Sequence, residues 1–264
     1  MTEGMASEFD HEREDPGTSD VSGDAAATKL FMTIKSMSRV AYARNLRLRD
    51  EDIIVAIDGV LNEDDIISFN ARFDQLLENQ EKLLLTICRN EVIYDVLVED
   101  KLGIELWFAD SEASAIAQKL FAQHHIGSKD QYQNYEALRD VHRHVVLYDT
   151  AYSAIATVAP PIWLLQHRAW EPLAAVIAAY ATSAVVSWWT FVATALLLAI
   201  YFHRIQFRII RSYSLFTEHF FWHVCAARTS TEAQLVCRQL DPKCHFDFSH
   251  VGPPTPTTSN QAPA

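Results

Sequence analysis

Residues 170–202 read WEPLAAVIAAYATSAVVSWWTFVATALLLAIYF, and Glu171 is the one acidic or basic side chain among these 33 residues. An apolar run of about 18 residues or more is typical of a membrane-spanning helix, because hydrocarbon offers no hydrogen bonds to backbone amides. A single straight helix of this length would extend about 50 Å, whereas the hydrocarbon core of a bilayer is about 30 Å thick. The run therefore indicates an integral membrane protein, built either with one long tilted span or with a hairpin of two short spans.

The charges that flank the run favour the hairpin. Arg168 lies upstream, and Arg204, Arg208 and Arg211 lie downstream. Basic flanks tend to stay in the cytoplasm, and the acidic opening MTEGMASEFDHEREDPG carries no apolar export signal. We therefore predict a membrane anchor over residues 159–211, with spans at about 172–187 and 190–207, in an inner or plasma membrane and with the N-terminal domain cytoplasmic. One long span, or a buried helical pair in a soluble protein, are the alternatives.

Aromatic and basic residues mark the ends of this anchor. Tryptophan favours the membrane–water interface, which suits a turn at Trp188 and Trp189, and arginine favours anionic headgroups. Pro160 and Pro161 should end the helix before the anchor, and residues 212–250 read as a juxtamembrane helical segment. The residues expected at the interface are Trp163, Trp170, Trp188, Trp189, Arg204, Arg208 and Arg211.

A soluble α+β domain is predicted over residues 28–110. Apolar runs at 30–34 and 52–57 favour strands, and the second ends in the turn signal Asp58-Gly59. Helical spacing follows over 66–77, and two further runs, 82–88 and 92–98, favour a strand pair. The predicted order is strand, strand, helix, strand, strand.

Residues 43–100, ARNLRLRDEDIIVAIDGVLNEDDIISFNARFDQLLENQEKLLLTICRNEVIYDVLVED, resemble the later two thirds of a PDZ domain of the bacterial type. The resemblance implies a peptide that adds as a strand to a sheet edge, with its carboxylate held by backbone amides of a glycine loop. This chain departs from the family, because no glycine lies between Met32 and Ala43 and Glu51 stands where the family usually has glycine. A substitute loop at 101–106, KLGIEL, lies after the domain, as a permuted arrangement requires.

The peptide site implied by this resemblance has two parts. Its helix wall would be Ile67, Asn70, Ala71 and Asp74, and its loop and strand would be Leu102, Gly103 and Ile104. The same residues also suit a small α+β core that binds nothing, and 101–106 also suits an ordinary connector.

Residues 111–158 are predicted to be a helical linker between the domain and the membrane. One helix should cover 111–126, with Ser111 as its N-cap, and a second should run from Lys129 to about Thr157. The acidic residues 1–27 and the Pro- and Thr-rich residues 251–264 are predicted to be disordered tails.

The chemistry-bearing residues give little support to catalysis. The chain has no G-x-S-x-G elbow, P-loop or G-x-G-x-x-G motif, and its net charge of −12 provides no basic patch for nucleic acid. The four cysteines form no CxxC pair, so we expect reduced thiols. His219 and His223 would share one face if they lay on a helix, and with Cys237 and Cys244 they would complete a zinc site.

Three functions are consistent with the sequence. The first is a non-enzymatic, membrane-anchored scaffold or adaptor without a cofactor, which binds a protein or peptide partner through the PDZ-like domain. The second is a membrane metal-binding protein or metalloenzyme that uses the His/Cys set with zinc. The third is a structural subunit of a membrane complex, either with copies of itself or with other proteins.

Overall fold

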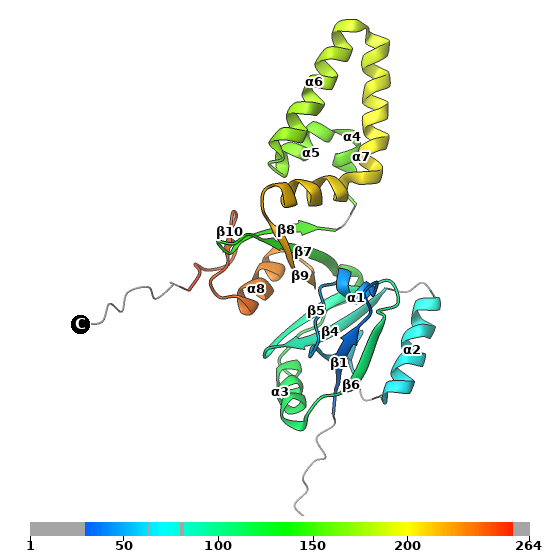
Figure 1. Ribbon diagram of the computed structural model, residues 1–264, viewed down its shortest axis with the longest axis vertical. Coiled ribbons are helices and arrows are strands. Elements are labelled where there is room, and N and C mark those ends of the chain that lie inside the picture. Colours follow the sequence, from blue (N-terminus) through cyan, green and yellow to red (C-terminus); the bar gives the residue numbers. More distant parts are fainter. Residues whose placement is uncertain (1–29, 63, 80–81, 151, 256–264) are drawn as a thin grey trace, which may run out of the picture.

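The computed structural model describes residues 30–255 except 63, 80–81 and 151. Within this range the chain is a mixed α+β structure, with a ten-stranded sheet from which a helical region projects (Figure 1). Of the predicted tails, 1–27 and 251–264, residues 1–27 and 256–264 lie outside the described residues, and residues 251–255 form no helix or strand.

The N-terminal part of the sheet follows the predicted order of elements. Neighbouring strands here are antiparallel, in the spatial order β5-β4-β2-β1-β6. Asn90 and Glu91, at φ 49° and 62°, form the tight turn between β4 and β5. The strands are β1 (Met32–Met37), β2 (Ile53–Ile57), β3 (Val60–Leu61), β4 (Leu83–Arg89), β5 (Val92–Val98) and β6 (Ile104–Phe108).

Three helices accompany these strands: α1 (Tyr42–Asn45), α2 (Ile66–Glu78) and α3 (Ser111–Phe121). Phe69 and Phe73 of α2, with ring centroids 5.7 Å apart, are buried in the largest core cluster. α3 packs through Ala117 into a separate cluster with β2 residues. The N-cap of α3 is Asp110, which accepts the Ala113 N–H at 2.7 Å, so the predicted cap at Ser111 was wrong by one residue.

The predicted second helix of the linker, 129–157, was wrong. A short 3-10 helix, η1 (Lys129–Gln131), leads into an antiparallel hairpin of β7 (Gln133–Arg139) and β8 (His144–Asp149). β7 also pairs along its length with β9 (Phe220–Ala227), which comes much later in the chain. Because that partner is remote, local spacing could not reveal the strand.

The predicted juxtamembrane helical segment, 212–250, is also largely a different structure. It contains the end of a long helix, then β9, then α8 (Ser230–Leu240) and β10 (His245–Phe246). β9 pairs with β7 on one side and with β5 on the other, so it joins the two parts of the sheet. Residues 150–219 are therefore an insertion that leaves the sheet after β8 and returns to it at β9.

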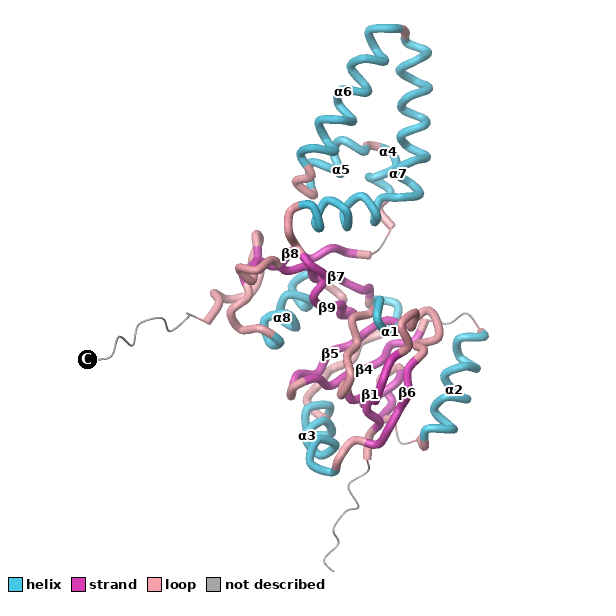
Figure 2. Tube along the Cα trace, in the orientation of Figure 1, coloured by secondary structure: helices cyan, strands magenta, loops and turns pink. Residues whose placement is uncertain are grey.

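The insertion is helical and contains α4 (Ala154–Val158), α5 (Pro160–Gln166), α6 (Trp170–Val186) and α7 (Trp188–Phe216). Pro160 begins α5, where its missing N–H costs nothing, and α4 ends before it. α6 and α7 run side by side in opposite directions and join at Ser187, whose backbone is extended (Figures 1 and 2). Among the described residues, α7 is the one helix long and apolar enough to cross a membrane, and α6, with 17 residues, is apolar but shorter.

The insertion packs on the sheet through buried and paired side chains. Arg211 of α7 forms an ion pair with Glu136 of β7, and the Ser214 hydroxyl donates to the Tyr148 hydroxyl at 3.0 Å. Trp163, predicted at the membrane interface, is 4% exposed and packs against Phe202 in the core of the helical region, so it is buried in protein.

Candidate functional site

The outer edge of β6 is one candidate site. β6 pairs with β1 on one side, and no other described strand lies beyond it (Figure 2). The Gly103 carbonyl accepts a hydrogen bond from the Ser38 N–H at 3.3 Å, so it faces β1. Backbone polar groups alternate between the two sides of a strand, so the N–H and C=O of Ile104 face the open edge.

The turn that leads into β6 is held in place. Gly103 has φ +67°, and a Cβ at this position would lie 3.2 Å from the Ala41 Cα, so the position requires glycine. Leu102 is buried, and its carbonyl accepts the Ala43 N–H at 3.1 Å. The predicted loop residues Leu102 and Gly103 therefore form a fixed turn, and Ile104 begins the edge strand.

The predicted helix residues lie on the solvent side of α2. Ile67, Asn70 and Ala71 are exposed, and Ile67 is 79% exposed. Asp74 forms an ion pair with Lys101, in the turn before β6, with Oδ1 and Nζ 3.0 Å apart. The structure thus brings the two predicted parts of the peptide site, α2 and the turn before β6, to the same edge of the sheet (Figures 1 and 2).

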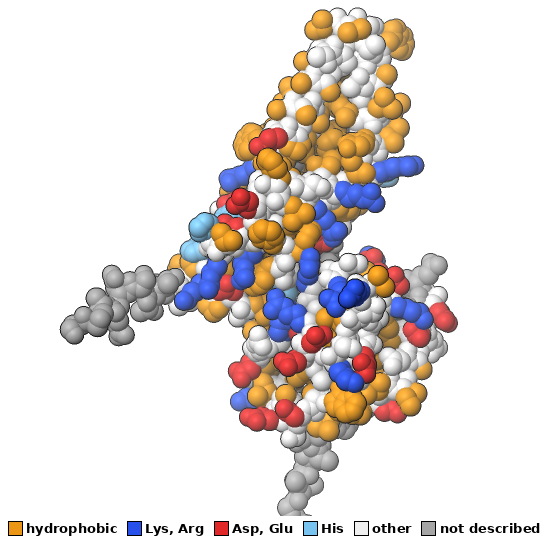
Figure 3. All heavy atoms as spheres, in the orientation of Figure 1, with side chains coloured by type: hydrophobic (Ala, Val, Ile, Leu, Met, Phe, Trp, Pro, Cys, Tyr) orange, Lys and Arg blue, Asp and Glu red, His pale blue; other side chains and the backbone are white. Residues whose placement is uncertain are grey.

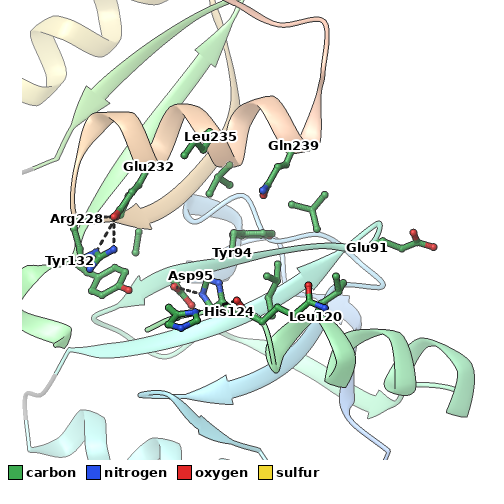
Figure 4. A pocket seen from close by; sticks show the side chains of 17 residues that line it. Glu91, Tyr94, Asp95, Leu120, His124, Tyr132, Arg228, Glu232, Leu235 and Gln239 are labelled. Carbon is green, nitrogen blue, oxygen red and sulfur yellow. Dashed lines mark hydrogen bonds and ion pairs between the residues drawn. The ribbon is translucent and has the colours of Figure 1, made fainter. Parts of the chain in front are cut away.

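A separate pocket of about 610 Å³ lies between α3, β5 and α8 (Figure 4). His124 Nε2 lies 2.8 Å from Asp95 Oδ2, and the Thr86 hydroxyl donates to Asp95 Oδ1 at 2.7 Å. On the other wall Arg228 and Glu232 form an ion pair at 2.5 Å. Sequence reasoning missed this pocket, because Asp95 and His124 lie in different elements and share no motif.

The pocket offers acid–base groups but no hydroxyl, thiol or amine of Ser, Thr, Cys or Lys among the described residues that line it. Asp95 is 3% exposed and orients His124, an arrangement that can hold an imidazole as a proton acceptor. The described residues that line the pocket include no serine, threonine, cysteine or lysine. It can hold a small polar molecule, but covalent catalysis by those side chains has no support here.

A buried polar cluster is formed by residues of β4, β5 and β9 and by the residue before β2. Arg89 donates to both carboxylate oxygens of Asp52, at 2.7 and 2.6 Å, and its Nη1 lies 3.3 Å from His223 Nδ1. Burial, followed by the charges of Arg89 and Arg49, holds the pKa of His223 well below its ordinary value. Burial, followed by the charge of Asp52, raises the pKa of Tyr94 well above its ordinary value. This cluster is an internal ion pair with a neutral histidine beside it.

The four residues of the predicted zinc set do not form a cluster of potential ligands. His219 lies in the loop after α7, and His223 lies inside β9 against Tyr94, so they do not share a helix face. Hydrogen bonding to Cys225 and burial hold the pKa of the Cys237 thiol well above its ordinary value. The structure describes Cys237 and Cys244 as buried free thiols.

The other predicted interface residues lie mostly on the surface of the helical region. Trp170, Trp188 and Trp189 are 57%, 69% and 78% exposed. Arg204 and Arg208 are exposed on α7, whereas Arg211 is engaged with Glu136. Six of the seven predicted residues, all except Trp163, therefore lie at least partly in contact with solvent.

In comparisons with known proteins, no family model, no curated protein and no solved structure matches the chain.

Proposed function

We propose that this protein is a membrane-anchored adaptor that binds an extended segment of a partner protein along the open edge of β6. One observation carries the proposal: the open edge of β6, the glycine turn before it and α2 lie next to one another, and α2 contacts the turn through the Asp74–Lys101 ion pair. Strand addition at an exposed edge is a common mode of peptide recognition, because main-chain hydrogen bonds supply affinity and neighbouring side chains supply specificity.

The chemistry of the edge favours a peptide with an apolar residue close to a free carboxylate. The N–H and C=O of Ile104 face the edge and can pair with an added strand. Ile67 and Ala71 provide apolar contacts from α2. Lys101, at the turn, is 63% exposed beside Asp74 and can also pair with a terminal carboxylate. These features support a PDZ-like mode of binding in a permuted arrangement.

The membrane part of the proposal is a hairpin anchor formed by α6 and α7. Both β8 and β9, which flank the insertion, pair with β7, so both ends of the insertion lie on one side of any membrane. If α7 crosses the bilayer, α6 must cross it too. α6 has 17 residues, as does the stretch of α7 from Trp188 to Arg204, so each is about 26 Å long, somewhat short of the roughly 30 Å hydrocarbon core.

The surface of the hairpin agrees with this arrangement. Hydrophobic side chains are spread over it, and basic side chains gather at its base, toward the sheet (Figure 3). Exposed Trp188 and Trp189 at the tip suit the far interface, and Arg204 and Arg208 suit headgroups at the near one. We propose that the sheet lies on the cytoplasmic face of an inner or plasma membrane.

Selection from a peptide library tests the binding proposal. The full chain in lipid nanodiscs is exposed to random peptides with free C-termini, and to the same library amidated at the C-terminus. We expect enrichment of peptides with an apolar last residue, and weaker binding after amidation.

Two matched variants locate the site. Asn70→Arg should abolish binding, whereas Gln118→Arg should retain it, because Gln118 is also exposed on a helix but lies on α3, outside the proposed site. Equal loss in both variants, or no enrichment by the parent protein, would contradict the proposal and favour a structural subunit. If amidation does not change binding, the peptide's carboxylate is not recognised, and only the strand-addition part of the proposal would remain.

Sealed vesicles test the hairpin. Epitope tags at the two ends of the chain should be cleaved by protease from the same side. Cleavage of one tag with protection of the other would contradict the hairpin.

A further inference from the structure

Three potential metal ligands meet where the β7–β8 turn approaches the loop after α7. Asp140 follows β7, His144 begins β8, and His219 precedes β9. One ligand atom from each lies within 4.8 Å of the others, and this is the one such group found among the described residues. A tetrahedral zinc ion with bonds of about 2.1 Å holds its ligands about 3.4 Å apart, so small side-chain rotations suffice to close the site.

The hydrogen bonds of His219 leave one ring nitrogen suited to a metal. Its Nδ1 lies 2.9 Å from the Thr217 carbonyl oxygen, which can only accept, so Nδ1 carries the proton. Nε2 then has a free lone pair. This atom is buried and has no hydrogen-bond partner among the described residues. A buried polar atom without a partner is costly, and a bound cation would satisfy it.

His144 is oriented in the complementary way. Its Nε2 lies 2.9 Å from Asp247 Oδ1, and a carboxylate accepts, so Nε2 carries the proton and Nδ1 is left with its lone pair. Metal-bound histidines usually donate their other ring nitrogen to a carboxylate or carbonyl, as both of these rings do. The His144 N–H also donates to Asp140 Oδ1 at 2.7 Å, which holds the third ligand in position.

The charges around the group do not oppose a cation. Arg143, next to His144, pairs with Asp241 at 3.1 Å. Arg168 pairs with Asp247 at 3.6 Å. Each of these guanidinium groups is thus engaged with a carboxylate, although Asp241 also pairs with Arg139 at 2.9 Å.

We propose that Asp140, His144 and His219 bind a zinc ion, with Asp247 as the carboxylate that orients His144. Two imidazole nitrogens and one carboxylate oxygen suit zinc, and a water molecule would complete four-coordination. The ion would tie the loop after α7 to the β7–β8 turn. This site shares only His219 with the set predicted from the sequence, and it does not depend on the proposed peptide-binding function.

Zinc binding is measured on the full chain in detergent, without a polyhistidine tag. The protein is stripped with chelator, loaded with zinc and freed of excess, and the metal is counted by mass spectrometry. We expect one zinc ion per chain, and loss of that ion in His144→Ala and in His219→Ala. Asp247→Asn should weaken binding about 10- to 100-fold. His142→Ala should retain the ion, because His142 is exposed in the same turn but outside the group.

Footprinting of the parent protein covers the case in which a variant fails to fold. Diethyl pyrocarbonate modifies accessible histidines, and zinc should protect His144 while His142 stays reactive. The proposal would be overturned by absence of stoichiometric zinc, by retention of zinc in His219→Ala, or by modification of His144 that is the same with and without zinc.

Discussion

Asp52→Asn should destabilise the sheet strongly, because it leaves the charge of Arg89 buried without a partner. Asp52 is 1% exposed and Arg89 is 6% exposed. Two of the hydrogen bonds from the guanidinium go to this carboxylate, at 2.7 and 2.6 Å, and a third goes to the Arg47 carbonyl at 2.9 Å. Breaking a buried ion pair by removing one partner costs about 3–5 kcal/mol. The substitution keeps the shape of the side chain, so the cost comes from the lost charge and from replacing one accepting oxygen by an NH2 group that faces a donor.

Hydrogen exchange measured by mass spectrometry reports this cost locally. A loss of about 3–5 kcal/mol corresponds to exchange about two to three and a half orders of magnitude faster in peptides that cover β2 and β4. Glu99→Gln is the matched control, because Glu99 pairs with Lys82 at 2.7 Å on the surface, where both side chains are more than half exposed. It should cost less than about 1 kcal/mol.

Two results would refute this reasoning. One is exchange in Asp52→Asn within about tenfold of the parent, which corresponds to about 1.4 kcal/mol. The other is an equal effect of Asp52→Asn and Glu99→Gln. Adding Arg89→Met to Asp52→Asn should recover part of the loss, since the stranded charge is then gone.

Three further predictions concern pH, thiol reactivity and the membrane. Lowering the pH from 7.5 to 5 should reduce the free energy of unfolding, because His223 has a depressed pKa and stays neutral when folded, whereas an unfolded histidine gains a proton below about pH 6.5. Urea titrations should show a smaller loss in His223→Gln. Cys237, buried and with a raised pKa, should react with iodoacetamide only after unfolding, as counted by mass spectrometry. Ile177→Arg should release the protein from carbonate-washed membranes, since arginine deep in a bilayer costs about 2.5–3.5 kcal/mol, while Val60→Arg on the sheet should not.

The outcomes that would contradict these expectations are distinct. If the free energy of unfolding of His223→Gln falls with pH as much as that of the parent, the buried neutral histidine is not the cause of that fall. Rapid alkylation of Cys237 in the native protein would mean that its part of the core opens. Equal membrane retention of Ile177→Arg and the parent would argue against a hairpin in the bilayer.

The elements that the sequence predicts well are those whose pattern is local. β2, β4 and β5 are apolar runs bounded by turn residues, and α2 shows apolar spacing on one face, so neighbouring residues carry enough information. The strand pair β7–β8 was assigned to a helix, because residues 129–157 repeat apolar side chains at intervals that also suit a helix. The pairing of β7 with β9 overrides that local preference.

The candidate sites show the same division. Gly103 and the exposed side of α2 could be named from the resemblance, whereas their approach through Asp74 and Lys101 needed the folded chain. The zinc set chosen by spacing failed because His223 lies in a strand. His144 meets His219 because β8 and β9 pair with opposite sides of β7, a relation that no local motif encodes.

The sequence alone determined that residues 170–202 form an apolar segment that avoids water. The free-energy cost of exposing this segment to water depends on its side chains and not on how the rest of the chain folds. Tertiary structure alone decided how that segment is connected. β9 returns to the sheet between β7 and β5, so both ends of the helical insertion are attached to the same sheet. Strand pairing joins residues far apart in the chain through backbone hydrogen bonds that any side chain permits, so only the folded sheet reveals this return.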